Sequence, residues 1–368
     1  MKLSLAKPDI TQKEIDAVVE VMKSGVLSIG PRIKEFEKKV AEYIGVKHAI
    51  AVNSGTSGLH LLIRALGIKE GDEVITTPFS FISSSNCILF ERAKPVFVDI
   101  DPYTLDIDIN RIEEKITDKT KAILAVDVFG HPVDIKRLRA IADEYGLKLI
   151  EDACEALGSE YDGIKVGSMA DGAVFAFYPN KQITTGEGGM IVTNSDEVNA
   201  LCRSLRNQGR SKCGLWLEHE YLGYNYRMNE LSAAIGSVQM DRLDEIIKKR
   251  CMVANMYNEA LSGIKGITLP YISPKVTVMS WFVYVIRLED DKKQAQMMQH
   301  LIDSGISCRP YFSPIHLQKY MVEQFGYTEG SFPVAEKAGR TCIALPFYND
   351  MSADEIEYIA EKIREGLS

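Results

Sequence analysis

The chain has 368 residues, of which 46% are hydrophobic and 26% are charged, values typical of a folded globular protein and not of a disordered or fibrous one. Asp and Glu number 51 against 43 Lys and Arg, and the resulting net charge of −8 argues against sequence-independent binding to nucleic acid or to anionic membranes. The length leaves room for two or three domains.

The first 52 residues predict two helices and a strand. Thr11 and Glu14 have the spacing of a capping box, and apolar residues follow at helical spacing until Gly25. A second helix is expected to end near Gly45, and a short apolar strand follows at 48–52.

Strand-like and helical runs then alternate. Helical spacing is clear at 59–66 and 135–145. Apolar runs predict strands at 73–77, 95–99, 121–128, 148–151, 173–177 and 190–193. This alternation is typical of βαβ units, and it predicts an α/β fold with a mostly parallel sheet covered on both faces.

The pattern changes after residue 227. One uninterrupted helix is expected over 227–261, followed by a strand at 279–288 and a closing helix at 353–367. Because a helix of this length commonly bridges two domains, we predict a large domain at 1–245 and a smaller one at 246–368.

The seven cysteines are odd in number and never spaced as CxxC, which indicates reduced thiols rather than a disulfide framework or a zinc site. The N-terminus has no apolar run of signal-peptide length, and no segment approaches the ~20 apolar residues that span a bilayer. We therefore expect a cytoplasmic protein without a metal site.

Polar residues directly after a strand are candidates for a site, because parallel strands direct their carboxyl ends to one edge of the sheet. Gly55, Thr56 and Ser57 follow the strand at 48–52 and directly precede the helix expected at 59–66. Free N–H groups and hydroxyls at a helix N-terminus bind phosphate. The alternative is an ordinary N-capping turn between a strand and a helix.

Two further segments carry chemistry. Three carboxylates lie close together at a strand end: Glu151, Asp152 and Glu155. Such crowding is energetically costly unless a metal or a cationic ring lies among them. The alternative interpretation of this segment is a solvated acidic loop. Lys181 stands between an aromatic run and a glycine-rich turn, where a partly desolvated amine can attack a carbonyl; the alternative is a surface lysine.

A phosphate cup, a carboxylate and a reactive lysine are the three anchors that pyridoxal 5'-phosphate requires. The cup holds the phosphate, the carboxylate keeps the ring nitrogen protonated, and the lysine holds the aldehyde carbon. These anchors occur here in this order along the chain, with Lys181 29 residues after Asp152, and together they predict this cofactor. A nicotinamide-dependent dehydrogenase is disfavoured, because no GxGxxG follows any predicted strand.

The sequence resembles the DegT/DnrJ/EryC1/StrS family of pyridoxal-phosphate-dependent sugar aminotransferases. The likeness is carried by NSGTSGLHLL, EDACEALGS, YPNKQITTGEGGMIVTN, GYNYRMNELSAAIG and RPYFSPIHLQKY. It implies a fold-type-I, aspartate-aminotransferase-like structure. Such a structure has a large domain with a seven-stranded mostly parallel sheet and a smaller C-terminal α+β domain.

The resemblance implies a role for each matching residue. Lys181 would form the Schiff base and carry a proton, Asp152 would pair with the ring nitrogen, and Glu155 would lie near the ring hydroxyl. Phe81 would stack on the ring; its alternative is a core phenylalanine. Many relatives carry a phosphate-binding serine where this chain has Ala176.

Other residues are implied to bind phosphate or substrate. Gly55, Thr56 and Ser57 would form the phosphate cup, and Asn225 would reach the phosphate of a neighbouring subunit, which implies a homodimer with shared active sites. Three residues are similar to those that contact the nucleotide sugar: Arg309, Tyr311 and His316. His316 could equally be a structural histidine.

The implied activity is transfer of an amino group, from glutamate as the expected donor, to a keto sugar attached to a nucleoside diphosphate. Such a reaction serves amino-sugar synthesis for a surface polysaccharide, a glycan or an antibiotic. Two alternatives stay open: a non-catalytic regulator or sensor that retains the fold, and a sugar dehydratase with the same cofactor. The dehydratases have histidine where this chain has Lys181, so Lys181 disfavours them.

Overall fold

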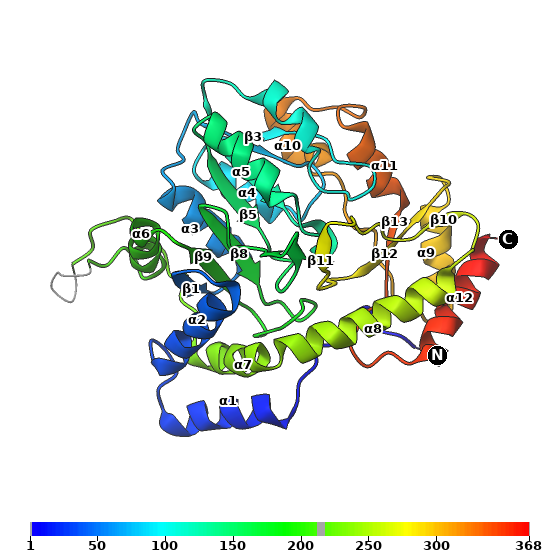
Figure 1. The fold of residues 1–368 in the computed structure, drawn as a ribbon, viewed down its shortest axis with the longest axis horizontal. Coiled ribbons are helices and arrows are strands. Elements are labelled where there is room, and N and C mark those ends of the chain that lie inside the picture. Colours follow the sequence, from blue (N-terminus) through cyan, green and yellow to red (C-terminus); the bar gives the residue numbers. More distant parts are fainter. Residues whose placement is uncertain (1, 212–217, 368) are drawn as a thin grey trace.

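A seven-stranded sheet forms the centre of the molecule in the computed structural model, which describes residues 2–211 and 218–367 (Figure 1). Its strands are β1 (His48–Val52), β2 (Glu73–Thr76), β3 (Lys94–Phe97), β4 (Thr120–Val126), β5 (Lys148–Asp152), β8 (Gly172–Ala176) and β9 (Gly189–Thr193). They lie in the order β1-β9-β8-β5-β4-β2-β3. β9 is antiparallel to both neighbours and the other pairs are parallel. The predicted α/β fold with a mostly parallel seven-stranded sheet is confirmed.

Helices cover both faces of this sheet, which explains why β2 and β9 are buried at every residue. One face packs against α3 (Gly55–Ala65), α4 (Ser83–Phe90) and α6 (Asp196–Arg206). The other packs against α2 (Pro31–Ile44), α5 (Ile135–Glu144) and α7 (Glu230–Asp241). Alternate residues of a strand therefore enter different cores, as Phe175 and Val174 of β8 do.

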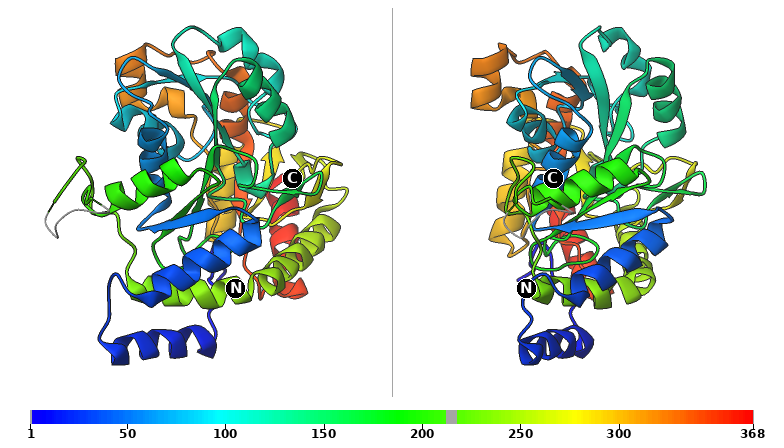
Figure 2. Two further views of the ribbon diagram at one scale, coloured as in Figure 1. Left: turned by 60° about the vertical axis from the view of Figure 1, so that its left-hand side comes forward. Right: turned by 90° about the vertical axis from the view of Figure 1, so that its left-hand side faces the viewer.

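The N-terminal helix α1 (Gln12–Ser24) has the predicted capping box of Thr11 and Glu14 and ends at Gly25. Gly25 has a φ of 71°, a conformation in which glycine is the least strained residue. Figure 2 shows α1 at the lower edge of the molecule, where it packs against α7.

A second core forms around a three-stranded sheet of β10 (Ile267–Thr268), β12 (Tyr284–Leu288) and β13 (Cys342–Leu345). It is covered by α8 (Leu243–Leu261), α9 (Gln294–Asp303) and α12 (Ala353–Leu367). The remaining elements are α10 (Lys319–Phe325), α11 (Pro333–Thr341), the small sheet of β6 (Glu160–Tyr161), β7 (Ile164–Lys165) and β11 (Val276–Val278), and short 3-10 turns at Ile109–Arg111, Glu113–Lys115, Val128–Gly130 and Ile315–Leu317. Leu3 also packs in this core. The domain boundary at residue 245 stays a prediction.

The prediction of one uninterrupted helix over 227–261 is wrong. Asn229 caps α7, and the chain leaves helical geometry at Arg242, with φ −107° and ψ 1°, before α8 continues toward α12 (Figure 1). The side chain of Arg242 is bound by Asp9 and Glu14. A break of a single residue leaves the apolar spacing almost unchanged, so periodicity could not reveal it.

The predicted strand over 279–288 begins too early, because β12 starts only at Tyr284. Trp281 has a φ of 56°, which interrupts an extended run. The neighbouring Ser280 instead donates its N–H to Ser159 Oγ, in the loop between β5 and β6, at 3.0 Å. The alternation of apolar residues therefore reflects burial on both sides of an irregular segment.

Six cysteines lie in the described part of the chain, and all six are free. Cys213 lies outside the described residues. In residues 2–211 and 218–367, no helix is long and apolar enough to cross a membrane.

Candidate active site

Three of the predicted segments meet at one edge of the large sheet. Asp152 is the last residue of β5, and Lys181 lies in the loop that leaves the parallel neighbour β8. β1 points in the same direction as β8, because both are antiparallel to β9, and Gly55 follows β1 directly. The expectation that these segments share the carboxyl edge of the sheet is confirmed.

The predicted phosphate cup is the first turn of α3. The helix begins at Gly55, before the expected position, so Gly55 and Thr56 present N–H groups that have no partner within the helix. Ser57 N–H is capped by Ser54 Oγ at 3.1 Å, and the Ser57 hydroxyl donates to Asn53 Oδ1 at 2.5 Å. Ser57 is thus engaged within the turn, whereas Gly55 and Thr56 are available to an anion.

Two adjacent serines of α4, which the sequence analysis missed, connect the cup to Asp152. Ser83 Oγ lies 2.7 Å from Thr56 Oγ1, and Ser84 Oγ donates to Asp152 Oδ2 at 2.6 Å. The other carboxylate oxygen of Asp152 accepts the backbone N–H of Cys154 at 3.2 Å. The run of three serines at 83–85 was the sequence feature that could have indicated these contacts, but no local pattern showed that one of the serines faces Asp152.

Lys181 is enclosed, with only 13% of its side chain exposed. Its Nζ lies 3.4 Å from Glu155 Oε1 and 3.8 Å from the ring centroid of Phe282, so a carboxylate and an aromatic face surround the amine. Burial raises the pKa of Glu155, although Lys181 and the N–H of Phe129 act in the opposite direction. The alternative that Lys181 is a surface lysine is excluded by this burial.

Glu151 is turned away from Asp152, to the opposite face of β5, where its Oε2 accepts the N–H of Gly167 at 2.7 Å. Burial raises its pKa to about 7. The three carboxylates of this segment are therefore buried, and the alternative of a solvated acidic loop is wrong.

Phe81 and Asn225 are both exposed. Phe81 has 60% of its surface exposed, which excludes the core alternative and leaves its ring free to cover a ligand. The backbone oxygen of Asn225 accepts from Asn53 Nδ2 at 3.5 Å, so its segment runs beside the phosphate cup. The Asn225 amide has no hydrogen-bond partner within the described part of the chain.

The three predicted substrate residues lie in different environments. Arg309 is exposed, and Tyr311 stacks on Phe282 at 6.3 Å between ring centroids, next to Lys181. His316 is fully buried and its Nε2 lies 3.0 Å from Glu336 Oε1. Burial lowers the pKa of His316. This placement favours the structural alternative for His316.

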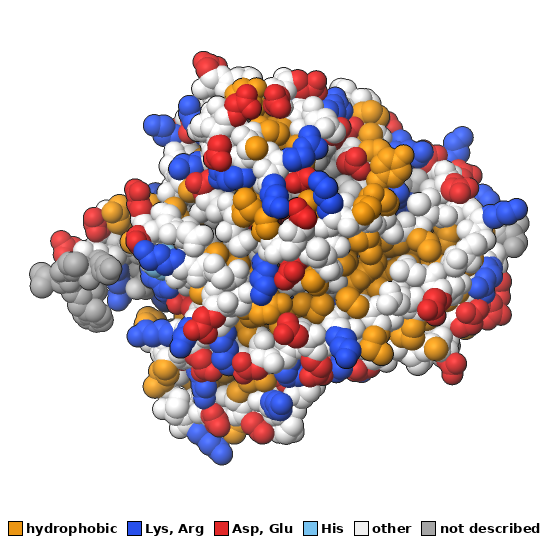
Figure 3. Space-filling model, in the orientation of Figure 1, with side chains coloured by type: hydrophobic (Ala, Val, Ile, Leu, Met, Phe, Trp, Pro, Cys, Tyr) orange, Lys and Arg blue, Asp and Glu red, His pale blue; other side chains and the backbone are white. Residues whose placement is uncertain are grey.

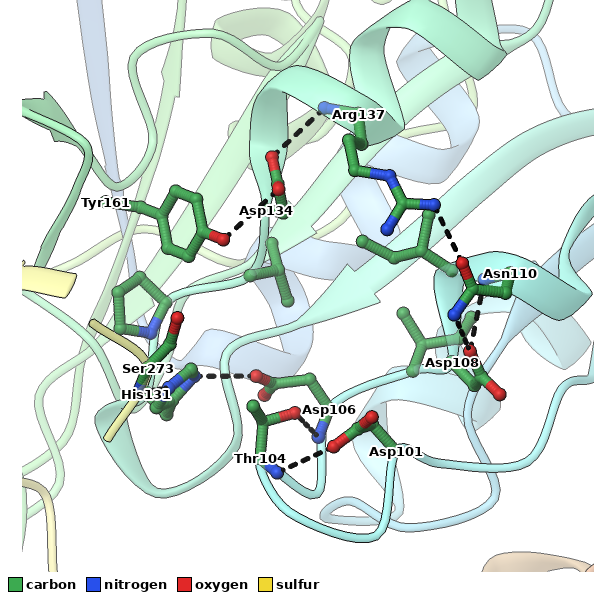
Figure 4. A pocket seen from close by; sticks show the side chains of 14 residues that line it. Asp101, Thr104, Asp106, Asp108, Asn110, His131, Asp134, Arg137, Tyr161 and Ser273 are labelled. Atoms are coloured by element: carbon green, nitrogen blue, oxygen red, sulfur yellow. Dashed lines mark hydrogen bonds and ion pairs between the residues drawn. The ribbon is translucent and has the colours of Figure 1, made fainter. Parts of the chain in front are cut away.

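A separate polar depression of about 200 Å³ lies away from these residues (Figure 4). Its side chains are bonded to one another: His131 Nδ1 donates to Asp106 Oδ2 at 2.8 Å, and His131 Nε2 accepts the N–H of Ser273 at 3.2 Å. None of the predicted site residues lines it. Among the described residues, no group of three or more His, Cys, Asp or Glu is placed to hold a metal ion.

Comparison with known proteins decides the family. The model of the DegT/DnrJ/EryC1/StrS aminotransferase family matches residues 8–364. The chain belongs to this family.

It is 37% identical over 363 residues to a GDP-perosamine synthase of Escherichia coli O157:H7, with 98% of each chain covered. It is also 37% identical over 364 residues to a pleiotropic regulatory protein of Geobacillus stearothermophilus, covering 98% of this chain and 94% of that one. The solved PLP-form of Spr1654 from Streptococcus pneumoniae superposes with a TM-score of 0.94 and 28% identity, covering 100% of this chain and 98% of that one.

The chain is accordingly a pyridoxal-phosphate-dependent aminotransferase, and its residues fit the cofactor. A Cβ on Gly55 would lie 2.9 Å from both Ala176 Cβ and Cys154 Sγ, so only glycine lets the helix N-terminus approach the end of β8 this closely. Anion-binding N–H groups, a buried carboxylate and an enclosed amine form the set of groups that this cofactor needs.

Proposed function

We propose that this chain transfers an amino group from glutamate to a keto group of a sugar attached to a nucleoside diphosphate. The enclosed amine of Lys181, held between Glu155 and Phe282, carries this proposal. Membership in a family of aminotransferases, with a nucleotide-sugar enzyme among the relatives, supports it. The product would serve the synthesis of an amino sugar for a polysaccharide, another glycan or an antibiotic.

The residues divide the work by position. Lys181 Nζ would hold the cofactor and would take up and return the proton at the substrate carbon. Asp152 pairs with the ring nitrogen, and Gly55 and Thr56 hold the phosphate. The bound cofactor supplies an electron-withdrawing ring that stabilises negative charge on that carbon.

Other contacts complete the proposed site. Phe81 stacks on the ring, Glu155 lies near its hydroxyl, and Ser57 supports the phosphate turn. Arg309 and Tyr311 contact the nucleotide sugar. The unpaired amide of Asn225 reaches the phosphate of a second copy of the chain, which makes a homodimer with shared active sites the working unit.

A cytoplasmic location is part of the same proposal, since the six described cysteines are free thiols. On the face shown in Figure 3, the described Lys and Arg side chains are interspersed with Asp and Glu, and no continuous basic patch covers it. This mixture supports a small-molecule substrate over a nucleic acid.

The experiment loads the protein with pyridoxal phosphate, adds glutamate and follows the visible absorbance of the bound cofactor. Wild-type protein should convert to the amine form, and Lys181→Ala should not. Lys119→Ala, which removes an exposed lysine from the loop before β4, should behave as the wild type. The absence of conversion in wild-type protein would exclude glutamate as the donor.

The same experiment tests the regulatory alternative. A sensor that retains only the fold would not bind the cofactor and would show no visible absorbance. The dehydratase alternative is disfavoured by Lys181 itself. The acceptor is then identified with a panel of 3-keto and 4-keto nucleotide sugars, each added to the enzyme after glutamate has converted its cofactor to the amine form.

A further inference from the structure

A chain of two buried hydroxyls ends on Asp152. Ser80 Oγ lies 2.7 Å from Ser84 Oγ, and Ser84 Oγ lies 2.6 Å from Asp152 Oδ2. Ser84 has no exposed surface, Ser80 is 4% exposed and Asp152 is 5% exposed. Because these groups are buried from bulk solvent, each hydroxyl hydrogen has few possible acceptors.

The direction of the chain follows from the hydrogen count. Ser84 has one hydroxyl hydrogen, and an ionised carboxylate can only accept, so at 2.6 Å this hydrogen goes to Asp152 Oδ2. The carbonyl oxygen of Phe81, at 3.2 Å, is the more distant acceptor. The Ser84 oxygen then accepts the hydrogen of Ser80, and both hydroxyl dipoles point toward the carboxylate.

Asp152 is thereby held at both oxygens, by Ser84 at Oδ2 and by the N–H of Cys154 at Oδ1. Two donors in different directions fix the plane of the carboxylate group. A fixed orientation is what a partner of a protonated ring nitrogen needs.

We propose that Ser84, supported by Ser80, is a positioning residue that orients Asp152 toward the ring nitrogen of the cofactor. This inference rests on the proposed role of Asp152. It adds that the electron-withdrawing strength of the bound ring would depend on Ser84, a hydroxyl of α4 that reaches the ring only through Asp152.

Pyridoxal phosphate binding to the apoprotein is the first measurement, and the pH dependence of the visible absorbance of the loaded protein is the second. Ser84→Ala should weaken binding roughly tenfold and shift the pH at which the absorbance changes, because it removes a charge-assisted hydrogen bond. Ser80→Ala should weaken binding by roughly threefold, since it removes only the support. Ser84→Thr retains the hydroxyl and should keep the wild-type pH dependence.

Ser85 offers the matched control. It is the next residue of α4, it is also fully buried, and its Oγ has no hydrogen-bond partner among the described residues. Ser85→Ala should leave both measurements within roughly twofold of the wild type. Thermal unfolding of each apoprotein, compared with the control, shows whether a change comes from misfolding; if Ser84→Ala does not fold, Ser80→Ala and Ser84→Thr decide.

Asp152→Asn separates the two levels of the hypothesis. If Asp152→Asn changes cofactor binding and the absorbance but Ser84→Ala behaves like Ser85→Ala, the positioning role is overturned and the role of Asp152 stands. If Asp152→Asn also leaves both measurements unchanged, the proposed role of Asp152 itself is wrong.

Discussion

Arg242, at the break between α7 and α8, binds two buried carboxylates, and its removal should destabilise the fold. Its guanidinium donates to Asp9 Oδ1 at 2.7 Å and to Glu14 Oε1 at 2.8 Å. The side chains of Arg242, Asp9 and Glu14 are 6%, 10% and 1% exposed. This cluster joins the N-terminal segment to the start of α8.

The magnitude follows from this burial. Burial by itself raises the pKa of Glu14, but hydrogen bonds from Thr11, Arg242 and Gln239 outweigh it and lower the pKa from 4.5 to about 2. At ~1.4 kcal/mol per pKa unit, Glu14 alone gains about 3 kcal/mol, which it shares among these partners. Removing one partner of a buried ion pair costs about 3–5 kcal/mol. We expect Arg242→Ala to lower the free energy of unfolding by this amount.

The assay is urea and thermal unfolding of the purified apoprotein. Arg242→Lys keeps the charge but not the fork that binds two carboxylates, so it should lose an intermediate amount. Lys248→Ala removes an exposed cation from α8 and should change stability by less than about 0.5 kcal/mol. A loss below about 1 kcal/mol in Arg242→Ala would refute the reasoning, because the two carboxylates would then be stable without their partner.

The pH dependence gives an independent check. Burial also opposes ionisation of Asp9, yet hydrogen bonds from Arg242, Asn349 and Lys249 lower its pKa from 3.8 to about 2. Because both folded pKa values lie below the unfolded ones, this stabilisation is present above pH 4.5 and is lost as the pH falls toward 2. The difference between wild type and Arg242→Ala should therefore be largest above pH 4.5 and smallest near pH 2.

Two further predictions concern the candidate site. Gly55→Ala should weaken pyridoxal phosphate binding and lower stability by about 1–3 kcal/mol, because the added Cβ overlaps Cys154 and the end of β8. The control Ala65→Ser, at the far end of α3, should leave cofactor binding unchanged. Equal cofactor affinity in the two variants would contradict the argument that only glycine allows this close approach. His316→Ala should lower the free energy of unfolding by about 2–4 kcal/mol and leave the KM for the nucleotide sugar unchanged. Arg309→Ala, at an exposed position, should raise that KM and leave the stability unchanged. A raised KM in His316→Ala alone would restore His316 as a substrate contact.

Local patterns in the sequence determined the elements of this protein and the chemistry of its site. Capping residues and apolar spacing predicted α1 and the strands of the large sheet, because these signals depend on neighbours in the chain. Lys181 and Asp152 were found in the same way, since each follows a strand-like run, and parallel strands bring such positions to one edge.

The tertiary structure alone decided the contacts between residues that lie far apart in the chain. Ser84 and Asp152 are 68 positions apart, and Asp9 and Arg242 are 233 positions apart. Arg242, at the break between α7 and α8, and Trp281, with its left-handed backbone, are also each bonded to a residue far along the chain, Asp9 and Arg250. Apolar periodicity shows which face of a helix or strand is buried, but it does not show which polar group of another element that face will contact.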